Sequence, residues 1–267
     1  MERHADERHS VTPLGRLAGE SATEVESIIR LVHCLKPLQP GQVSDPALVT
    51  AVQTTVELDS VYVPIHKRTP KELQSWLGVL RQQSIIGHLL QALGLQTREP
   101  HEHGARAKRA VAALAYVSGQ DMESIETMLG QHGGGFDGSA GPIRSIASRT
   151  ADLIGTAGRV AEILHPEFKL GSRTERLAVR LTLGIPGTVV DLGRIAGTGL
   201  ARGDYLRLAA AGLVDHVSIA AADDEVILAC VDRDPDRLAT VRAAAETMAD
   251  AEAGSAHQIP SLAPYAA

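Results

Sequence analysis

The residues best suited to chemistry are basic and lie in a predicted helix over residues 141–165. One side of that helix carries Arg144, Ser148, Arg149 and Arg159. A guanidinium can donate two parallel hydrogen bonds to a phosphate and can stack on a base. The pattern therefore indicates binding to a polyanion such as nucleic acid. Taken alone, however, such a basic run is more often a helix face that is only solvated.

The charge is distributed unevenly along the chain, which favours the hypothesis that the basic helix binds a polyanion. The whole chain has a net charge of −6. Residues 141–212 hold ten Lys and Arg against six Asp and Glu, a net charge of +4, while residues 1–140 sum to −3 and residues 213–267 to −7. Nine of the ten cations in the basic segment are Arg. A general basic coat is excluded, and any polyanion site should lie within residues 141–212.

The elements that must position these residues are helices. Small and medium aliphatic residues dominate the 44% hydrophobic content, and aromatic residues make up only 3%. Strand alternation is nearly absent, so we expect an all-α fold. In the basic segment, apolar and small residues recur every three or four positions and should form the buried face of one long helix that ends at Pro166. They are Ile143, Ile146, Ala147, Thr150, Leu153, Ile154, Ala157, Val160, Ala161 and Leu164.

A second pattern follows in residues 173–212. The sequence predicts short helices on either side of a glycine-containing turn at residues 196–199. Glycine lets a backbone approach another group closely, although paired glycines also make ordinary turns.

These segments together resemble the C-terminal half of superfamily-two DNA helicases. The phrase AYVSGQDMESIETML followed by GPIRSIASRTADLIGTAGRVAEIL is similar to their ratchet-helix bundle. RLAVRLTLGIPGTVVDLGRIAG with YLRLAAAGL is similar to their helix-hairpin-helix unit, and VTPLGRLAGES to the end of their winged helix. The resemblance runs from about Val11 to Val231. The helicases that it concerns are the archaeal DNA-repair helicases and their bacterial DEAD/DEAH-box relatives.

The resemblance implies a helical bundle with one long ratchet-like helix, followed by a helix-hairpin-helix-like unit. It implies contact with single-stranded DNA through Arg144, Ser148, Arg149 and Arg159, and through Gly197 and Gly199 with Arg202 and Arg207. The aromatic residue usual near the centre of a ratchet helix is missing, and Leu153 lies close to its place. Base stacking should therefore be weak.

The helix patterns and the resemblance together predict four regions. They are residues 1–104 (the end of a winged helix and linker helices), 105–170 (the ratchet-helix bundle), 171–231 (the helix-hairpin-helix-like unit) and 232–267 (a terminal helix and a disordered tail). We further expect residues 97–104 to form a linker, residues 214–231 a helical stretch, residues 232–249 the terminal helix itself, and Trp76 a core anchor.

The sequence offers no catalytic, metal or cofactor site. The letters of a helicase box at Asp6–His9 follow polar residues rather than a buried strand, and no Gly-Lys-Ser/Thr phosphate loop follows the glycines of residues 130–141. His101 and His103 are two positions apart, do not share a helix face and lack further ligands. The resemblance implies that ATP and Mg²⁺ belong to a motor domain outside this chain, so we expect this chain alone to hydrolyse no ATP.

Two cysteines without close spacing and a charged N-terminal segment favour a cytoplasmic protein without disulfides or a membrane span. The expected partners are single-stranded DNA, bound weakly, and a separately encoded helicase motor. The alternative is a helical protein-interaction scaffold that has lost DNA binding. The acidic total charge and the missing aromatic residue favour this second hypothesis.

Overall fold

The fold was obtained as a computed structural model that describes residues 11–65, 70–130 and 140–257. Within these ranges the chain forms fifteen α-helices and three short 3-10 helices, with no strand. The predicted all-α fold is therefore confirmed.

The chain divides into two compact units. The first contains the described residues up to Leu114 together with Met122–Ala178, and the second contains Ala115–Asp121 with the described residues from Val179 onward. Two helices, α7 and α10, begin in the first unit and end in the second. The boundaries differ from the four regions expected from the sequence. Residues 105–114 and 122–170 share the first unit with the helices that precede them, while residues 115–121 belong to the second unit.

The helices vary in length from a single turn to about seven turns. Those that begin in the first unit are α1 (Pro13–Glu20), α2 (Val25–Leu35), η1 (Pro40–Gln42), α3 (Asp45–Val52), α4 (Val56–Asp59), α5 (Pro70–Gln82), α6 (Gly87–Ala92), α7 (Pro100–Val117), α8 (Met122–Gly130), α9 (Ala140–Leu164) and α10 (Gly171–Leu183). Those of the second unit are η2 (Gly187–Val189), α11 (Val190–Ala196), η3 (Gly197–Gly199), α12 (Arg202–Ala210), α13 (His216–Ala221), α14 (Asp224–Cys230) and α15 (Pro235–His257).

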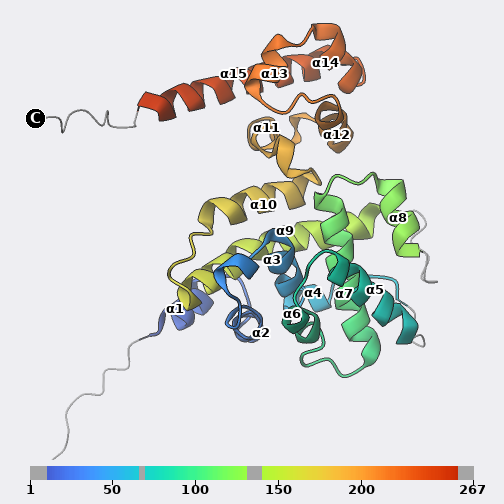
Figure 1. Cartoon of the computed structure of the whole chain (residues 1–267), viewed down its shortest axis with the longest axis vertical. Helices are drawn as coiled ribbons and strands as arrows, with labels where there is room; N and C mark the ends of the chain where they lie inside the picture. The colour runs from blue at the N-terminus through green and yellow to red at the C-terminus, as the bar shows by residue number, and fades with distance from the viewer. Residues whose placement is uncertain (1–10, 66–69, 131–139, 258–267) are drawn as a thin grey trace, which may run out of the picture. The chain divides into compact units, whose positions relative to one another are not determined.

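Helix α9 is the predicted long helix, and α1, α2, α3 and α4 pack against it (Figure 1). Nine of the ten residues predicted for its buried face are buried, and the tenth, Leu164, is partly exposed. Burying an aliphatic side chain contributes ~1.5–3 kcal/mol relative to exposure, so this face fixes which side of the helix points inward. The spacing of apolar residues in the sequence therefore also determines which residues α9 leaves exposed.

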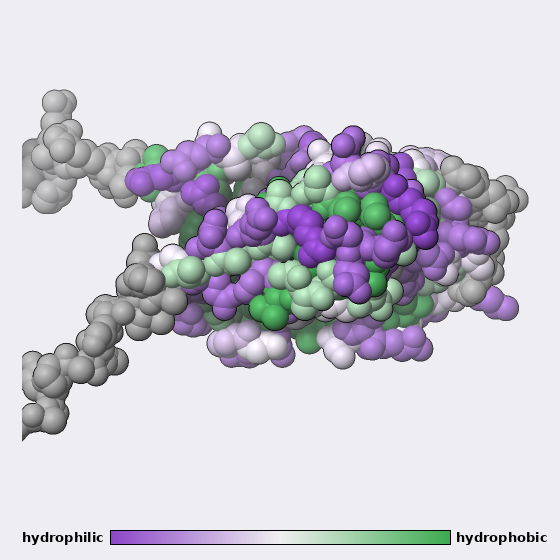
Figure 2. All heavy atoms as spheres, turned by 90° about the horizontal axis from the view of Figure 1, so that it is seen from above, coloured by the Kyte–Doolittle hydropathy of each residue, from purple (hydrophilic) through white to green (hydrophobic). Residues whose placement is uncertain are grey.

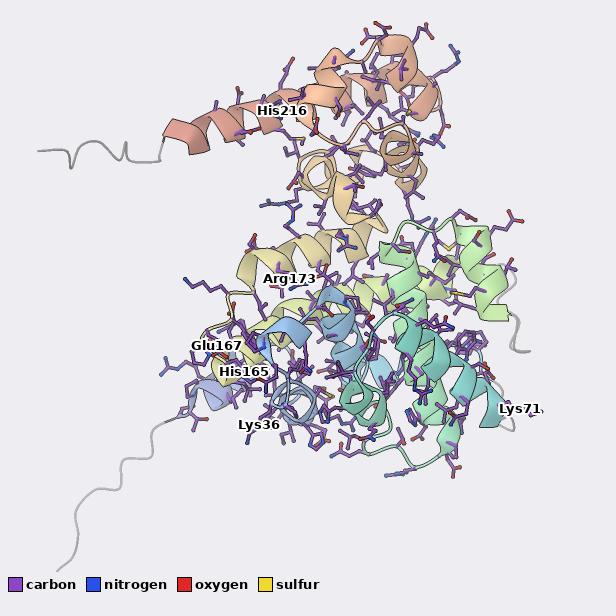
Figure 3. The ribbon with its side chains drawn as sticks, in the orientation of Figure 1. Lys36, Lys71, His165, Glu167, Arg173 and His216 are labelled. Carbon is purple, nitrogen blue, oxygen red and sulfur yellow. The ribbon has the colours of Figure 1, made fainter. Side chains whose placement is uncertain are left out.

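The C-terminal end of α9 is held by polar contacts. Pro166 cannot continue the helix, and the ring of His165 lies 3.2 Å from the backbone oxygen of Leu35. Figure 3 labels His165 and Glu167 here, and Arg173 on α10. Arg173 Nε donates to Asp45 Oδ1 at 2.6 Å and so ties the start of α10 to α3.

The second unit has its own apolar core. Leu192 of α11, Tyr205 of α12 and Val241 of α15 are fully buried together with residues of α13 and α14. The turn before α11 requires Gly184, whose φ is +69°. A Cβ there would lie 2.3 Å from the Tyr116 ring, so a larger residue would be excluded as well as strained.

Three expectations need correction. Residues 97–104 are not a linker throughout, because α7 begins at Pro100. The stretch 214–231 is not one helix but α13 and α14, separated by a break before Asp224. The terminal helix does not end near residue 249 but continues to His257. The prediction from local composition made this charged, solvated helix too short.

The surface is mainly polar. Hydrophilic residues occupy much of the face shown in Figure 2, with smaller apolar patches between them. None of the helices in the described ranges combines the length and apolar content needed to cross a bilayer.

The first unit buries a charged pair. Lys108 of α7 and Glu72 of α5 are 0% and 2% exposed, and Lys108 Nζ lies 3.2 Å from Glu72 Oε1. Lys108 also donates to the oxygen of Pro64 at 2.7 Å, and Trp76, the predicted core anchor, is buried beside Glu72 and donates to it at 3.2 Å. Burial lowers the pKa of Lys108, while Glu72 opposes that shift. The ammonium is thus retained in the core only because it has these partners.

We predict that Lys108→Met lowers the free energy of unfolding by about 3 kcal/mol, because the buried Glu72 carboxylate then loses its ion pair with Lys108. The double variant Lys108→Met with Glu72→Gln should recover at least about 1 kcal/mol, because the buried charge is gone while an acceptor for Trp76 remains. Urea unfolding measures both. Lys71→Met, on the exposed start of α5 (Figure 3), is the control and should change little. A single variant as stable as the wild type would contradict this account.

Candidate nucleic-acid interface

The exposed face of α9 carries the predicted binding residues. Arg144, Ser148, Arg149 and Arg159 are all exposed. At ~100° per residue, Arg144, Ser148 and Arg159 fall within a sector of about 60°, while Arg149 lies at the edge of the exposed face. Arg144 and Arg159 are about 22 Å apart along the helix axis, at ~1.5 Å per residue. The structure thus brings these four residues to one side of one rigid element.

Two of these arginines have exposed carboxylate partners. Arg149 lies 3.2 Å from Asp152 on the same helix, and Arg159 lies 3.5 Å from Glu20 of α1. The side chains in both pairs are about half exposed. Ion pairs of this kind contribute ~0–1 kcal/mol in water, so a phosphate can compete for these guanidinium groups. Arg144 has no ion pair among the residues that the structure describes.

Leu153, near the position of the missing aromatic residue, is 4% exposed and belongs to the buried face of α9. It cannot form a platform for a base. The exposed face of α9 therefore offers charge and hydrogen-bond donors but no stacking surface of its own.

The predicted turn at 196–199 exists and links α11 to α12 through η3. Gly197 has a φ of +53°, which favours glycine, and its oxygen accepts a 2.7 Å hydrogen bond from the hydroxyl of Tyr205. A Cβ on Gly199 would approach Thr240 of α15 at 3.2 Å. Both glycines thus have conformational or packing reasons to be present, whether or not a phosphate binds there.

The start of α12 is already occupied by a carboxylate. Asp204 is fully buried, and its Oδ2 accepts from the backbone N–H of Ala201 at 2.7 Å. Its charge is balanced by Arg207 at 2.6 Å and Arg237 at 3.3 Å. A helix N-terminus attracts anions, but here the protein supplies its own anion, which would repel a DNA phosphate.

The two predicted arginines of α12 are engaged in the second unit. Arg207 also lies 2.9 Å from Asp232 and donates to the oxygen of Cys230 at 2.6 Å. Arg202 donates to the oxygens of Gly184, Tyr116 and Gln120, and it lies over the Tyr116 ring at 4.6 Å. These contacts give both side chains a structural role, so the DNA contact predicted for them loses support relative to that of α9.

Sequence reasoning missed a second group of cations, in the first unit. Arg106 and Arg109 of α7 are each 2% exposed. Together with Arg30 of α2 they converge on Asp59, the last residue of α4. Arg106 donates hydrogen bonds to both carboxylate oxygens of Asp59, at 2.7 and 2.8 Å. The nearest nitrogens of Arg30 and Arg109 lie 2.9 Å and 3.4 Å from the same carboxylate. The three-residue spacing of Arg106 and Arg109 was a signal that they share a face, but nothing local showed that this face is buried.

The pKa values follow from this crowding. Burial of the Asp59 carboxyl opposes its ionisation, but hydrogen bonds and charge from Arg106, with Arg30 and Arg109, outweigh that effect and hold its pKa below the ordinary value of 3.8. Burial lowers the pKa of Arg109 to about 10; Asp59 opposes this shift and Arg106 adds to it. Asp59 is therefore a shared counterion on which the alignment of α2, α4 and α7 depends.

Other candidate residues have ordinary roles in the described ranges. His101 and His103 lie in the first turn of α7, and the ring of His103 is 3.2 Å from the oxygen of Leu90. No group of three or more potential metal ligands occurs in the described residues. Burial raises the pKa of the Cys34 thiol to about 11, and Cys230 is also buried with a raised pKa. Both thiols should react slowly.

The chain matches no protein-family model and none of the curated proteins compared with it.

We predict that Asp59→Asn lowers the free energy of unfolding by about 2 kcal/mol at pH 7. This is less than for a fully buried pair, because the Asp59 side chain is 37% exposed. A carboxyl whose folded-state pKa is depressed stabilises the protein above its unfolded pKa of ~3.9, and this contribution is lost as pH falls through the folded value. The wild-type advantage should therefore be full above about pH 5, begin to decline near the unfolded value, and be lost as the pH falls through the folded value, which lies below 3.8.

Urea unfolding of both proteins between pH 3 and 7 makes the measurement, with the exposed Asp152→Asn as control. A stability difference that is independent of pH across this range would mean that the Asp59 charge is not what stabilises the cluster.

Proposed function

We propose that this chain binds single-stranded DNA through the exposed face of α9, as the nucleic-acid-binding part of a superfamily-two DNA helicase. The observation that carries the proposal is the two-sided character of α9. One side is fixed in the core, and the other presents Arg144, Arg149 and Arg159 to solvent from a rigid element. Phosphate contacts of this kind position a strand without reading its sequence.

The order of elements supports the helicase assignment. The long helix α9 is followed along the chain by α10 and then by the helix–turn–helix of α11, η3 and α12. This is the order that the resemblance to helicases predicts: a ratchet helix, then a helix-hairpin-helix-like unit. Under this proposal the chain serves a motor that supplies ATP hydrolysis, and α9 holds the strand while the motor advances.

Binding should be weak and dependent on salt. The arginines of the α9 face contribute three positive charges, and Asp152 on the same face opposes them. About three neutralised phosphates give a slope near −2 for the logarithm of affinity against the logarithm of salt, at ~0.7 per phosphate for single strands. Affinity should then fall by a little less than tenfold between ~50 and ~150 mM salt.

A protein-interaction scaffold is the second candidate. It is favoured by the burial of Leu153, which leaves α9 without a stacking residue, and by the structural engagement of Arg202 and Arg207. Under this hypothesis the basic face of α9 is only solvated.

We predict that Arg144→Glu and Arg149→Glu each weaken binding to a labelled oligonucleotide at least fivefold at low salt, because each replaces an attractive charge with a repulsive one. Arg81→Glu is the matched control, since Arg81 is exposed at the end of α5 outside this face, and it should bind like the wild type. Polarisation titrations at two salt concentrations give both the affinities and the slope.

The opposite change provides a gain of binding. Asp152→Asn removes the negative charge on the face and frees Arg149, so affinity should rise about two- to threefold at low salt. The scaffold hypothesis is favoured instead if the wild type does not bind at low salt, or if the α9 variants and Arg81→Glu lose affinity equally.

A further inference from the structure

A cavity of about 880 Å³ opens beside the buried arginine cluster of the first unit. Its walls come from the segment after α4, from the loop before α7 and from α7 itself. The charged residues that line it are Arg30, Asp59, Arg98, Glu102, Arg106 and Arg109. Four cations thus face two carboxylates, and Glu26, outside the lining, pairs with Arg30 at 3.0 Å. Positive charge remains in excess in a partly desolvated site.

Arg109 is the side chain that this arrangement leaves incompletely satisfied. Arg106 uses all three of its nitrogens, on Asp59 and on the oxygens of Leu93 and Leu95. Among the described residues, the hydrogen bonds of Arg109 go to Val61 at 3.3 Å and Asp59 at 3.4 Å, longer than the usual ~2.7–3.2 Å. Its buried Nε has no hydrogen-bond partner within the same part of the chain. A buried donor without an acceptor costs ~1–3 kcal/mol, and more when it is charged.

We propose that this cavity binds a phosphate group, with Arg109 as its central donor and Arg98 at its exposed edge. A phosphate carries up to two negative charges and several acceptor oxygens, so it could offer the Arg109 guanidinium shorter hydrogen bonds than Val61 and Asp59 do and offset the excess charge. The volume exceeds that of a lone phosphate and falls in the range of ~300–1,000 Å³ found for small-molecule sites. The cavity therefore has room for a larger molecule that carries the phosphate.

Two sources carry this chemistry: a free nucleotide, or the terminal phosphate of a nucleic-acid strand. Tyr62, which lines the cavity and is 69% exposed, offers a ring on which a base can stack in either case. The proposal does not depend on DNA binding by α9, because the cavity and the α9 face use different residues.

The test is isothermal titration of the whole chain with five probes. These are inorganic phosphate, adenosine monophosphate, adenosine, and a ten-nucleotide strand with and without a 5′-phosphate. Saturable binding of inorganic phosphate is expected, with tighter binding of the monophosphate and no binding of adenosine at this site. A free nucleotide is indicated if adenosine monophosphate binds more tightly than the phosphorylated strand, and a strand end if the 5′-phosphate strengthens binding of the strand.

Three variants locate the site. Arg109→Gln should abolish phosphate binding, Arg98→Gln should weaken it about three- to tenfold, and Arg81→Gln should leave it unchanged. Arg98 is exposed, so its variant decides the matter if Arg109→Gln does not fold, as circular dichroism will show. The proposal is overturned if inorganic phosphate gives no saturable binding, or if binding persists at wild-type strength in every folded variant of Arg98 and Arg109.

These outcomes are separate from those of the α9 proposal. Arg144→Glu and Arg149→Glu should leave phosphate binding in the cavity intact. Arg98→Gln should leave the binding of an unphosphorylated strand to α9 nearly intact.

Discussion

The arrangement of the first unit depends on the burial of one side of α9. The nine predicted aliphatic, small or hydroxyl-bearing residues of this side are buried, and α1 to α4 pack against the helix. Removing any large one from the core would cost ~2–5 kcal/mol. The helix therefore cannot rotate to bury its arginines. Exposure of Arg144 and Arg149 follows from this packing rather than from any preference of their own. The functional proposal rests on the same constraint, since a rigid helix with a fixed solvent face can hold several cations in register along a strand.

The cations of this chain divide into two groups with different physical roles. Asp204 in the second unit and Asp59 in the first are each surrounded by arginines that align separate helices, and such groups stabilise the fold only as complete sets. On the exposed face of α9, water screens the ion pairs of Arg149 and Arg159, and Arg144 has no ion pair among the described residues, so all three remain available to a ligand. Formal charge alone does not separate these groups, because the net charge of +4 over residues 141–212 includes arginines of both kinds.

Periodicity predicted the long helix and its buried residues because the information is local: each apolar position is set by its distance along one helix. The same logic placed Trp76 in the core. It failed for Arg106 and Arg109, whose burial depends on Asp59, about fifty residues earlier in the chain. It failed again for Arg202, whose acceptors come from the end of α7 and the turn before α11. Pairings distant in sequence leave no periodic pattern, so these arginines could not be distinguished from solvated ones.

The most direct test of the α9 face is protection of a thiol placed within it. Ser148→Cys introduces an exposed thiol, while the native Cys34 and Cys230 are buried and should label slowly. Gln82→Cys, exposed at the end of α5, serves as the reference. With single-stranded DNA at saturating concentration and low salt, labelling at position 148 should slow several-fold while labelling at position 82 is unchanged. Equal labelling rates at position 148 with and without bound DNA would contradict the proposal that α9 holds the strand.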